Sequence, residues 1–265
     1  MTPNIRPHHQ RAIVGLTEAY RNDPRFAALI IGGSVAKGYA REDSDVDFML
    51  VATDEEYAQR AASRDLLINR TDLSEYDGGY VDGKIISESF LKDVADRGNE
   101  PSRAAFLGAF LTFSRLPRLQ PLLDRIPVYP ELDRDRRIKT FYCLAFMGNW
   151  LMYEASRYDN RYGITRAASQ LSLFSSRLIL AHNRILFPYH KWMLKAVEEA
   201  AEKPAGFLDR MQELLDKPSV QTAGPFFECI QNYKDWGVSD IEAYTWFMTE
   251  IEWSWMNGNT PMEDW

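Results

Sequence analysis

Cysteine is scarce in this sequence. Two cysteines, Cys143 and Cys229, occur in 265 residues, far apart and outside any CxxC pair. Structural zinc sites and disulfide frameworks need several cysteines at close and regular spacing. Both are therefore excluded as organising features, and we expect a chain that folds around a hydrophobic core.

Long hydrophobic runs, internal repeats and an excess of basic residues are missing as well. The longest apolar run, at 104–113, is half the ~20 residues of a membrane helix, and the first twenty residues are polar. We therefore expect no membrane span and a cytoplasmic location. The net charge of -7 weighs against binding nucleic acid, which needs clustered Lys and Arg to neutralise phosphates. A cationic small molecule or a protein partner fits this charge better, and the oligomeric state stays open.

Two different patterns flank a stretch at 115–131 that holds four prolines. We predict an N-terminal domain at 1–116, a Pro-rich linker at 117–131 and a C-terminal domain at 132–265. The first domain alternates short apolar runs with helical patterns, which predicts strands at 26–32, 46–52 and 78–86 and helices at 8–21, after Ser34, 54–66 and 88–97. The second has helical periodicity at 136–158, 165–186, 191–202, 207–215 and 238–256, which predicts a helical bundle.

Within the first domain, the segment GGSVAKGYAREDSDVDFMLV at 32–51 places two carboxylates at the head of an apolar run. A carboxylate in a hydrophobic strand is costly unless it has a partner. Side chains alternate along a strand, so Asp45 and Asp47 project from the same side, with Cα atoms roughly 6.5 to 7 Å apart. Such a pair can hold one or two Mg²⁺ ions, which together clamp the oxygens of a phosphoryl displacement.

The same segment offers a site for phosphate. Gly32 and Gly33 remove side-chain bulk where a backbone must approach a ligand, and they lead to Ser34 at the start of a short helix. Backbone N–H groups at a helix start, with the serine hydroxyl, bind anions. Gly-Ser is also a common helix cap, and the acidic residues could form a solvated turn. The spacing of eleven residues from Ser34 to Asp45, with apolar strands on both sides, favours the functional interpretation.

This segment resembles the signature of the DNA polymerase beta superfamily of nucleotidyltransferases, which has Gly-Ser, a gap of about ten residues and Asp-x-Asp at the head of a strand. The predicted layout is similar to that of the small two-domain nucleotidyltransferases that modify aminoglycosides and lincosamides. The resemblance implies an α+β chain, with a catalytic α/β domain built on a mixed sheet and an all-α helical bundle after it. It also implies an enzyme of the EC 2.7.7 type that requires Mg²⁺ and transfers a nucleoside monophosphate from ATP to a hydroxyl, possibly of an aminoglycoside-type antibiotic.

The resemblance assigns roles to individual residues. Gly33 and Ser34 match the Gly-Ser that binds the triphosphate, and Asp45 and Asp47 match the pair that binds two metal ions. Lys37 falls where many members carry a basic residue, so it either contacts phosphate or is a solvated helix lysine.

The family also has a third carboxylate on a later strand, which completes the metal site or accepts the proton of the attacking hydroxyl. The candidates are Asp82, Glu88 and Asp77, and we favour Asp82 because it continues the best strand pattern. Alternatively, VDGK at 81–84 is an Asp-Gly hairpin turn, and Glu88 lies in the first turn of the next helix. If no third carboxylate serves, the protein binds nucleotide as a regulator without catalysis. Transfer of AMP to a protein partner is a further alternative.

The helical half has fewer signals. Pro188 is expected to end a helix and leave residues 189–192 in a turn. From there Lys191 either reaches the triphosphate across a cleft between the domains, as second-domain residues do in related enzymes, or helps to close the bundle. We predict that His8 and His9 are exposed. Four aromatic residues are predicted to lie mostly in the core: Trp150, Tyr153, Tyr158 and Tyr162.

Overall fold

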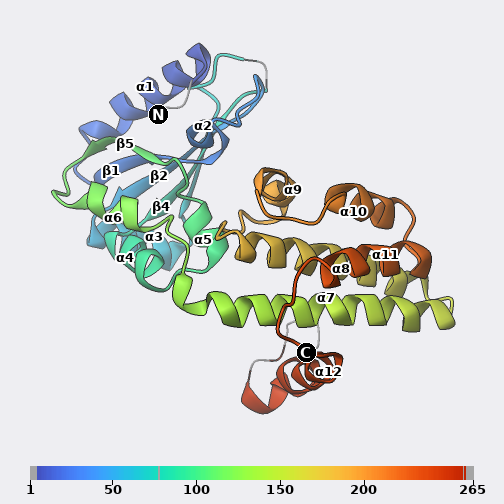
Figure 1. Cartoon of the computed structure of the whole chain (residues 1–265). Helices are drawn as coiled ribbons and strands as arrows, with labels where there is room; N and C mark the ends of the chain where they lie inside the picture. The colour runs from blue at the N-terminus through green and yellow to red at the C-terminus, as the bar shows by residue number, and fades with distance from the viewer. Residues whose placement is uncertain (1–4, 77, 259, 261–265) are drawn as a thin grey trace. The chain divides into compact units, whose positions relative to one another are not determined.

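In the computed structural model, residues 5–76, 78–258 and 260 are described. The chain divides into two compact units between Val128 and Tyr129. In Figure 1 the first unit runs from blue to green and the second from yellow-green to red. Each unit is described by itself.

The first unit is built on a five-stranded mixed sheet with the order β3-β4-β2-β1-β5. β2 and β4 are parallel, whereas β1 pairs antiparallel with β2 and β5, and β3 pairs antiparallel with β4. The strands are β1 (Phe26–Ile31), β2 (Val46–Ala52), β3 (Leu67–Arg70), β4 (Val81–Ile86) and β5 (Phe110–Ser114). The helices are α1 (Pro7–Arg21), α2 (Gly33–Lys37), α3 (Asp54–Ser63), α4 (Glu88–Arg97), α5 (Glu100–Ala104) and α6 (Leu119–Arg125).

Hydrophobic side chains cover both faces of this sheet. Alternate residues of β1 and β2, such as Leu29 and Phe48, pack with Leu16 of α1 on one face. The residues between them, such as Ile30, pack with Leu123 of α6 on the other. Burying each of these large side chains contributes about 1.5–3 kcal/mol. The two buried layers fix the register of β2, and with it the side of the sheet on which Asp47 lies.

The predicted elements of the first unit are confirmed, with ends shifted by up to three residues, and the mixed sheet is confirmed as well. The structure adds β3, α5, β5 and α6, which the sequence patterns did not predict. Helix α6 lies inside the proline-rich stretch, where Pro121 occupies the first helical turn and so removes no intrahelical hydrogen bond. Because Leu119 and Leu123 are buried, residues 117–131 do more than connect the two units.

The second unit contains only helices in the part of it that the structure describes. Its centre is an α7–α8 hairpin, in which Gly148 lets the two helices approach closely, since a Cβ there would lie 2.9 Å from the backbone nitrogen of Leu171. The predicted all-α class is confirmed. The helices are α7 (Arg134–Arg157), α8 (Arg161–His182), α9 (His190–Glu199), α10 (Phe207–Asp216), α11 (Val220–Gln231) and α12 (Asp240–Phe247), with short 3₁₀ or π segments at Glu131–Asp133, Met248–Glu252 and Ser254–Asn257.

Three expectations for the second unit are wrong. Helix α8 ends at His182, well before Pro188, because Arg184 adopts the left-handed conformation with φ 57°. The segment after Pro188 is not a turn, since α9 begins at His190 and contains Lys191. The four aromatic residues predicted as core are exposed, because the opposite faces of α7 and α8 form the core. The exposed fractions are 37% for Trp150, 54% for Tyr153, 75% for Tyr158 and 76% for Tyr162.

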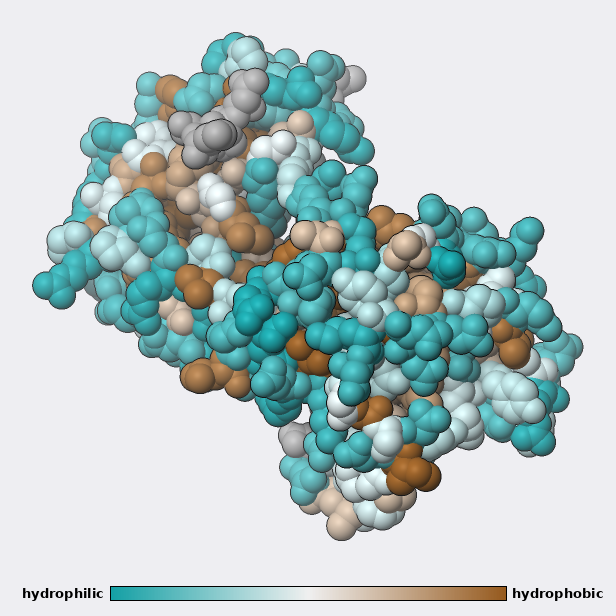
Figure 2. All heavy atoms as spheres, in the orientation of Figure 1, coloured by the Kyte–Doolittle hydropathy of each residue, from teal (hydrophilic) through white to brown (hydrophobic). Residues whose placement is uncertain are grey.

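The surface seen in Figure 2 is mainly hydrophilic on both units, with small and scattered apolar areas. Across the described residues, no helix combines the length and the apolarity that crossing a bilayer requires. Both cysteines are free thiols.

Candidate active site

The glycine-serine turn and the carboxylate strand lie directly beside each other. β1 ends at Ile31, and Gly32 and Gly33 turn the chain into α2. The backbone N–H of Gly32 donates a hydrogen bond of 3.0 Å to the carbonyl of Asp47, so the turn is tied to the start of β2. Ser34 follows in the first turn of α2 and is buried. The structure thus brings the predicted phosphate-binding residues and the predicted carboxylates to one place.

Gly33 is required at this contact for two reasons. Its φ of +64° lies in the left-handed region, which side chains disfavour. A Cβ on Gly33 would also lie 1.7 Å from Oδ2 of Asp47. The Asp47 carboxylate therefore rests against the backbone at the start of α2, at the place where a bound phosphate would be expected.

A second carboxylate joins Asp47 through the parallel pairing of β2 and β4. The register places Asp47 opposite Asp82, and in-register partners on neighbouring strands share a face of the sheet. Asp45 and Tyr80 directly precede these two strands, and the Asp45 carboxylate is close enough to the Tyr80 hydroxyl to raise its pKa. The carboxylates of Asp45, Asp47 and Asp82 consequently lie where the parallel strands β2 and β4 begin.

Tyr80 is a residue of this site that the sequence patterns did not single out. The charge of Asp45 and the hydrogen bond to it raise the pKa of Tyr80, and the charges of Asp82 and Asp47 add to this. The phenol is therefore within electrostatic reach of all three carboxylates. Its position two residues before Asp82, on the same side of the strand, was the signal available in the sequence.

The structure distinguishes between the candidates for the third carboxylate. VDGK is strand rather than turn, so the hairpin alternative is wrong. Gly83 is needed there because its Cβ would lie 2.2 Å from the ring of Phe48. Glu88 lies in the first turn of α4, as the alternative expected, where its Oε1 is 2.7 Å from Nζ of Lys92. Asp77 lies outside the described residues. Of the candidates described, the register brings Asp82 to Asp47.

The two predicted lysines lie in different units. Lys37 is the last residue of α2, where burial lowers the pKa of its ammonium and the charge of Asp47 partly offsets this effect. Lys37 is thus partly buried within electrostatic reach of the carboxylates. Lys191 is exposed in the second unit, with Nζ 5.6 Å from the centroid of the Trp192 ring. Its contact with the triphosphate stays a prediction.

The donor set fits Mg²⁺ that is held jointly with a substrate. Within residues 5–258, apart from position 77, no three His, Cys, Asp or Glu side chains converge to form a metal site by themselves. Mg²⁺ commonly uses one or two protein carboxylates and completes its shell with waters and substrate phosphates. Asp47 and its register partner Asp82, beside the glycine turn, offer that arrangement.

The loop before Asp45 is held by His8 and His9, two residues that we predicted to be exposed. His9 is fully buried and His8 is partly buried at the same helix end, so the prediction that both are exposed is wrong. Nε2 of His9 lies 2.8 Å from the carbonyl oxygen of Ser44, and Nε2 of His8 lies 3.0 Å from that of Glu42. No local pattern predicts these contacts, because they join residues that are more than thirty positions apart.

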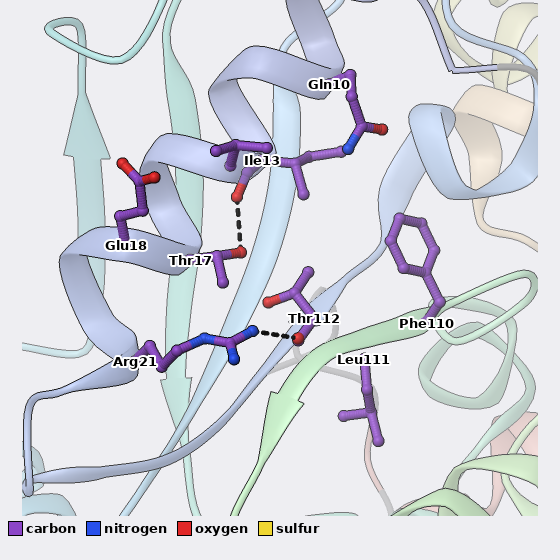
Figure 3. Close-up of a pocket in the computed structure, with 9 residues that line it drawn as sticks. Gln10, Ile13, Thr17, Glu18, Arg21, Phe110, Leu111 and Thr112 are labelled. Carbon is purple, nitrogen blue, oxygen red and sulfur yellow. Dashed lines mark hydrogen bonds between the residues drawn. The ribbon is translucent and has the colours of Figure 1, made fainter.

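A pocket of about 500 Å³ lies elsewhere on the first unit, between α1 and β5 (Figure 3). Two of its polar side chains bond within the protein: Arg21 donates to the carbonyl of Thr112 at 3.1 Å, and Thr17 donates to the carbonyl of Ile13 at 2.7 Å. Among the described residues that line this pocket, none is a predicted site residue.

Residues 17–93 match the protein family described as "Nucleotidyltransferase domain". Over this range the first unit is similar to nucleotidyltransferase domains. The matched range runs from α1 into α4 and includes both the glycine-serine turn and the three carboxylates at 45, 47 and 82. This match agrees with the predicted resemblance over that range, and it supports a transferase of the EC 2.7.7 type that acts on a nucleoside triphosphate.

Among solved structures, the chain is similar to a crystal structure of a nucleotidyltransferase-like protein from Exiguobacterium sibiricum 255-15. The two share 11% sequence identity with a TM-score of 0.44, over 97% of this chain and 83% of the other. No curated protein matches the chain.

Proposed function

We propose that the nucleotidyltransferase domain transfers AMP from ATP to a hydroxyl of a small molecule, in a reaction that requires Mg²⁺. The observation that carries this proposal is the position of the Asp47 carboxylate, which lies against the backbone of Gly33 and in register with Asp82. A phosphate-binding turn and a pair of metal-binding carboxylates are the two parts that phosphoryl transfer needs in one place.

The triphosphate is bound by the residues at the start of α2. The backbone N–H groups after Gly32 and the Ser34 hydroxyl donate hydrogen bonds to phosphate oxygens. Lys37 supplies a positive charge from the end of the same short helix. Support for this role comes from its partial burial and its electrostatic contact with Asp47, which keep the ammonium close to the turn.

Asp45, Asp47 and Asp82 would hold Mg²⁺, with two ions bound when the nucleotide is present. The metal would neutralise phosphate charge and align the triphosphate. The chain's own contribution is to keep negative charge at a fixed place. The register of β2 and β4 positions Asp47 and Asp82, and the Tyr80 phenol lies within electrostatic reach of Asp45.

Asp82 accepts the proton of the attacking hydroxyl. The acceptor oxygen forms a bond to the α-phosphorus of ATP, and the bond from that phosphorus to the bridging oxygen of the leaving group breaks, which releases pyrophosphate. A general base must lie within hydrogen-bond reach of the hydroxyl, and such a group contributes typically 10²–10⁴-fold to the rate.

The acceptor we propose is an amine-bearing hydroxylated molecule of the aminoglycoside type, whose modification would confer antibiotic resistance. The support is electrostatic: the chain has 38 acidic and 31 basic residues, and such a balance attracts cationic ligands. In the second unit, Lys191 is proposed to contact the triphosphate.

A screen of pyrophosphate release tests this proposal. Aminoglycosides, lincosamides and simple sugars are each combined with the four nucleoside triphosphates, with and without Mg²⁺. We expect release with ATP and an aminoglycoside. Release confined to lincosamides or uncharged sugars would refute the electrostatic argument and leave the transferase reaction standing. Binding of Mg·ATP without release from any acceptor would instead favour a nucleotide-binding regulator.

The matched control for this screen is a nearby carboxylate that takes no part in the site. Asp43 is exposed, lies two residues before Asp45 and pairs with Arg41 at 3.0 Å. Asp47→Asn should abolish release, whereas Asp43→Asn should leave it close to the wild-type rate.

A further inference from the structure

We propose that His9 and Tyr76 are positioning residues for Asp45, which they orient through the carbonyl group of Ser44. The inference rests on the proposed function, in which Asp45 binds the metal. Neither residue touches the substrate in this proposal. Each acts through the peptide group that joins Ser44 to Asp45.

Two donors from distant parts of the chain meet at this one carbonyl oxygen. Nε2 of His9, from α1, lies 2.8 Å from it. The hydroxyl of Tyr76, from the segment before β4, donates a second hydrogen bond to the same oxygen. A carbonyl oxygen has two lone pairs, so its acceptor capacity is filled.

These two hydrogen bonds fix the direction of Asp45 because the peptide group is planar. The carbonyl of Ser44 and the N–H of Asp45 belong to one rigid plane. Holding the oxygen from two directions prevents rotation of that plane and sets the position of the Asp45 Cα at the entrance to β2. On the other side, the Asp45 carboxylate interacts electrostatically with the Tyr80 phenol, whose pKa it raises.

The chemistry of His9 indicates that its N–H donor is what holds the carbonyl of Ser44. Burial lowers the pKa of His9, so the ring is neutral near pH 7 and carries one N–H. A carbonyl can only accept, so that N–H is on Nε2. Nδ1 is then buried without a hydrogen-bond partner, which is unfavourable. An apolar side chain would avoid this penalty but could not hold Ser44.

Ring contacts keep the donors in place. The His8 ring lies 4.1 Å from the His9 ring and 5.2 Å from the Tyr76 ring, and the His9 and Tyr76 rings are 6.2 Å apart, all between centroids. The two contacts of the Tyr76 ring are edge-to-face, and such contacts favour one mutual orientation. The loop itself is closed by a 2.9 Å hydrogen bond from the backbone N–H of Arg41 to Oγ of Ser44.

The test compares His9→Leu, His9→Gln and Tyr76→Phe. Calorimetry measures ATP affinity with and without Mg²⁺, and hydrogen–deuterium exchange measures the protection of residues 41–45. Loss of one hydrogen bond to a positioned group should weaken Mg²⁺-dependent ATP binding roughly tenfold in His9→Leu and Tyr76→Phe. Exchange at 41–45 should rise in both. His9→Gln keeps an N–H donor and should recover most of the affinity and protection.

Two controls separate positioning from stability. His182→Leu alters a histidine of the second unit whose Nε2 is also bonded and whose Nδ1 is also buried without a partner, and it should change neither readout. In an Asp45→Asn background, His9→Leu should have no further effect on metal-dependent ATP affinity, because His9 acts on that affinity only through the Asp45 carboxylate.

Two results would overturn the inference. One is a His9→Leu protein that melts at a lower temperature yet keeps wild-type exchange at 41–45. The other is an affinity loss of the same size with and without Asp45. If wild-type protein shows no Mg²⁺-dependent ATP binding, the proposed function fails, and the exchange measurements alone decide whether His9 and Tyr76 hold the loop.

Discussion

Replacing Gly33 by alanine perturbs the contact on which the site depends. The added Cβ would lie 1.7 Å from Oδ2 of Asp47, 2.4 Å from its Cγ and 2.6 Å from its Cβ. Ordinary contact begins near 3.4 Å, so the oxygen must retreat by about 1.7 Å, the difference between 3.4 and 1.7. The carboxylate cannot make that movement without leaving its place beside the start of α2.

The expected destabilisation of Gly33→Ala has two parts, one from the backbone at position 33 and one from the side chain of Asp47. An alanine in the left-handed region costs about 1–2 kcal/mol. Forcing Asp47 away from its rotamer adds about 0.5–1.5 kcal/mol. The effect on catalysis is larger, because a misplacement of about 1 Å can reduce a rate 100-fold. We therefore expect Gly33→Ala to lose at least about 100-fold in rate and to be destabilised by about 1.5–3.5 kcal/mol.

Gly38→Ala is the matched control. Gly38 also has a positive φ, of +74°, but nothing lies within 4 Å of the Cβ that would be added. It should show the backbone part of the destabilisation alone and keep nearly full activity. Urea unfolding and pyrophosphate release with the acceptor found by the screen give both quantities. Equal activity in Gly33→Ala and Gly38→Ala would refute the claim that the Asp47 contact matters.

Three further predictions concern other residues. Gly83→Ala should lower the free energy of unfolding by about 1–3 kcal/mol by overpacking against the Phe48 ring; if Phe48→Leu in the same protein restored none of it, that cause would be wrong. Lys37→Met should weaken ATP binding in calorimetry with little change in unfolding, and an unchanged affinity would remove Lys37 from the phosphate site. Burial raises the pKa of the Cys143 thiol to about 11 from 9.0. Since the unfolded chain loses this proton first, the stability that wild type has over Cys143→Ala should fall between pH 9 and pH 11 in urea titrations; a constant difference would contradict this.

The sequence predicted those parts of the fold whose pattern is local. β2 alternates buried and partly buried residues over its first four positions, and the spacing from Ser34 to Asp45 and Asp47 predicted a candidate site there. β3 escaped prediction because its four residues are partly or fully exposed, which leaves no apolar signal. Helix α11 escaped because Gly224 and Pro225 are typical of loops, yet they lie inside it.

The remaining features of the site depend on pairing between distant segments. The parallel register of β2 and β4 decides that Asp82 joins Asp47, and no local pattern contains that register. The same register explains how Tyr80 comes to face Asp45. His9 looked like an exposed residue near the chain start, and only the position of α1 against the loop before β2 buries it.

Calorimetric titration of ATP into wild-type, Asp47→Asn and Asp43→Asn protein, each with and without Mg²⁺, tests the central claim most directly. Wild-type and Asp43→Asn protein should bind ATP much more tightly when Mg²⁺ is present. Asp47→Asn should lose that metal-dependent gain while it keeps the wild-type unfolding midpoint within a few degrees. If Asp47→Asn bound Mg·ATP as tightly as wild type, Asp47 would not be a ligand of the metal and the site would lie elsewhere.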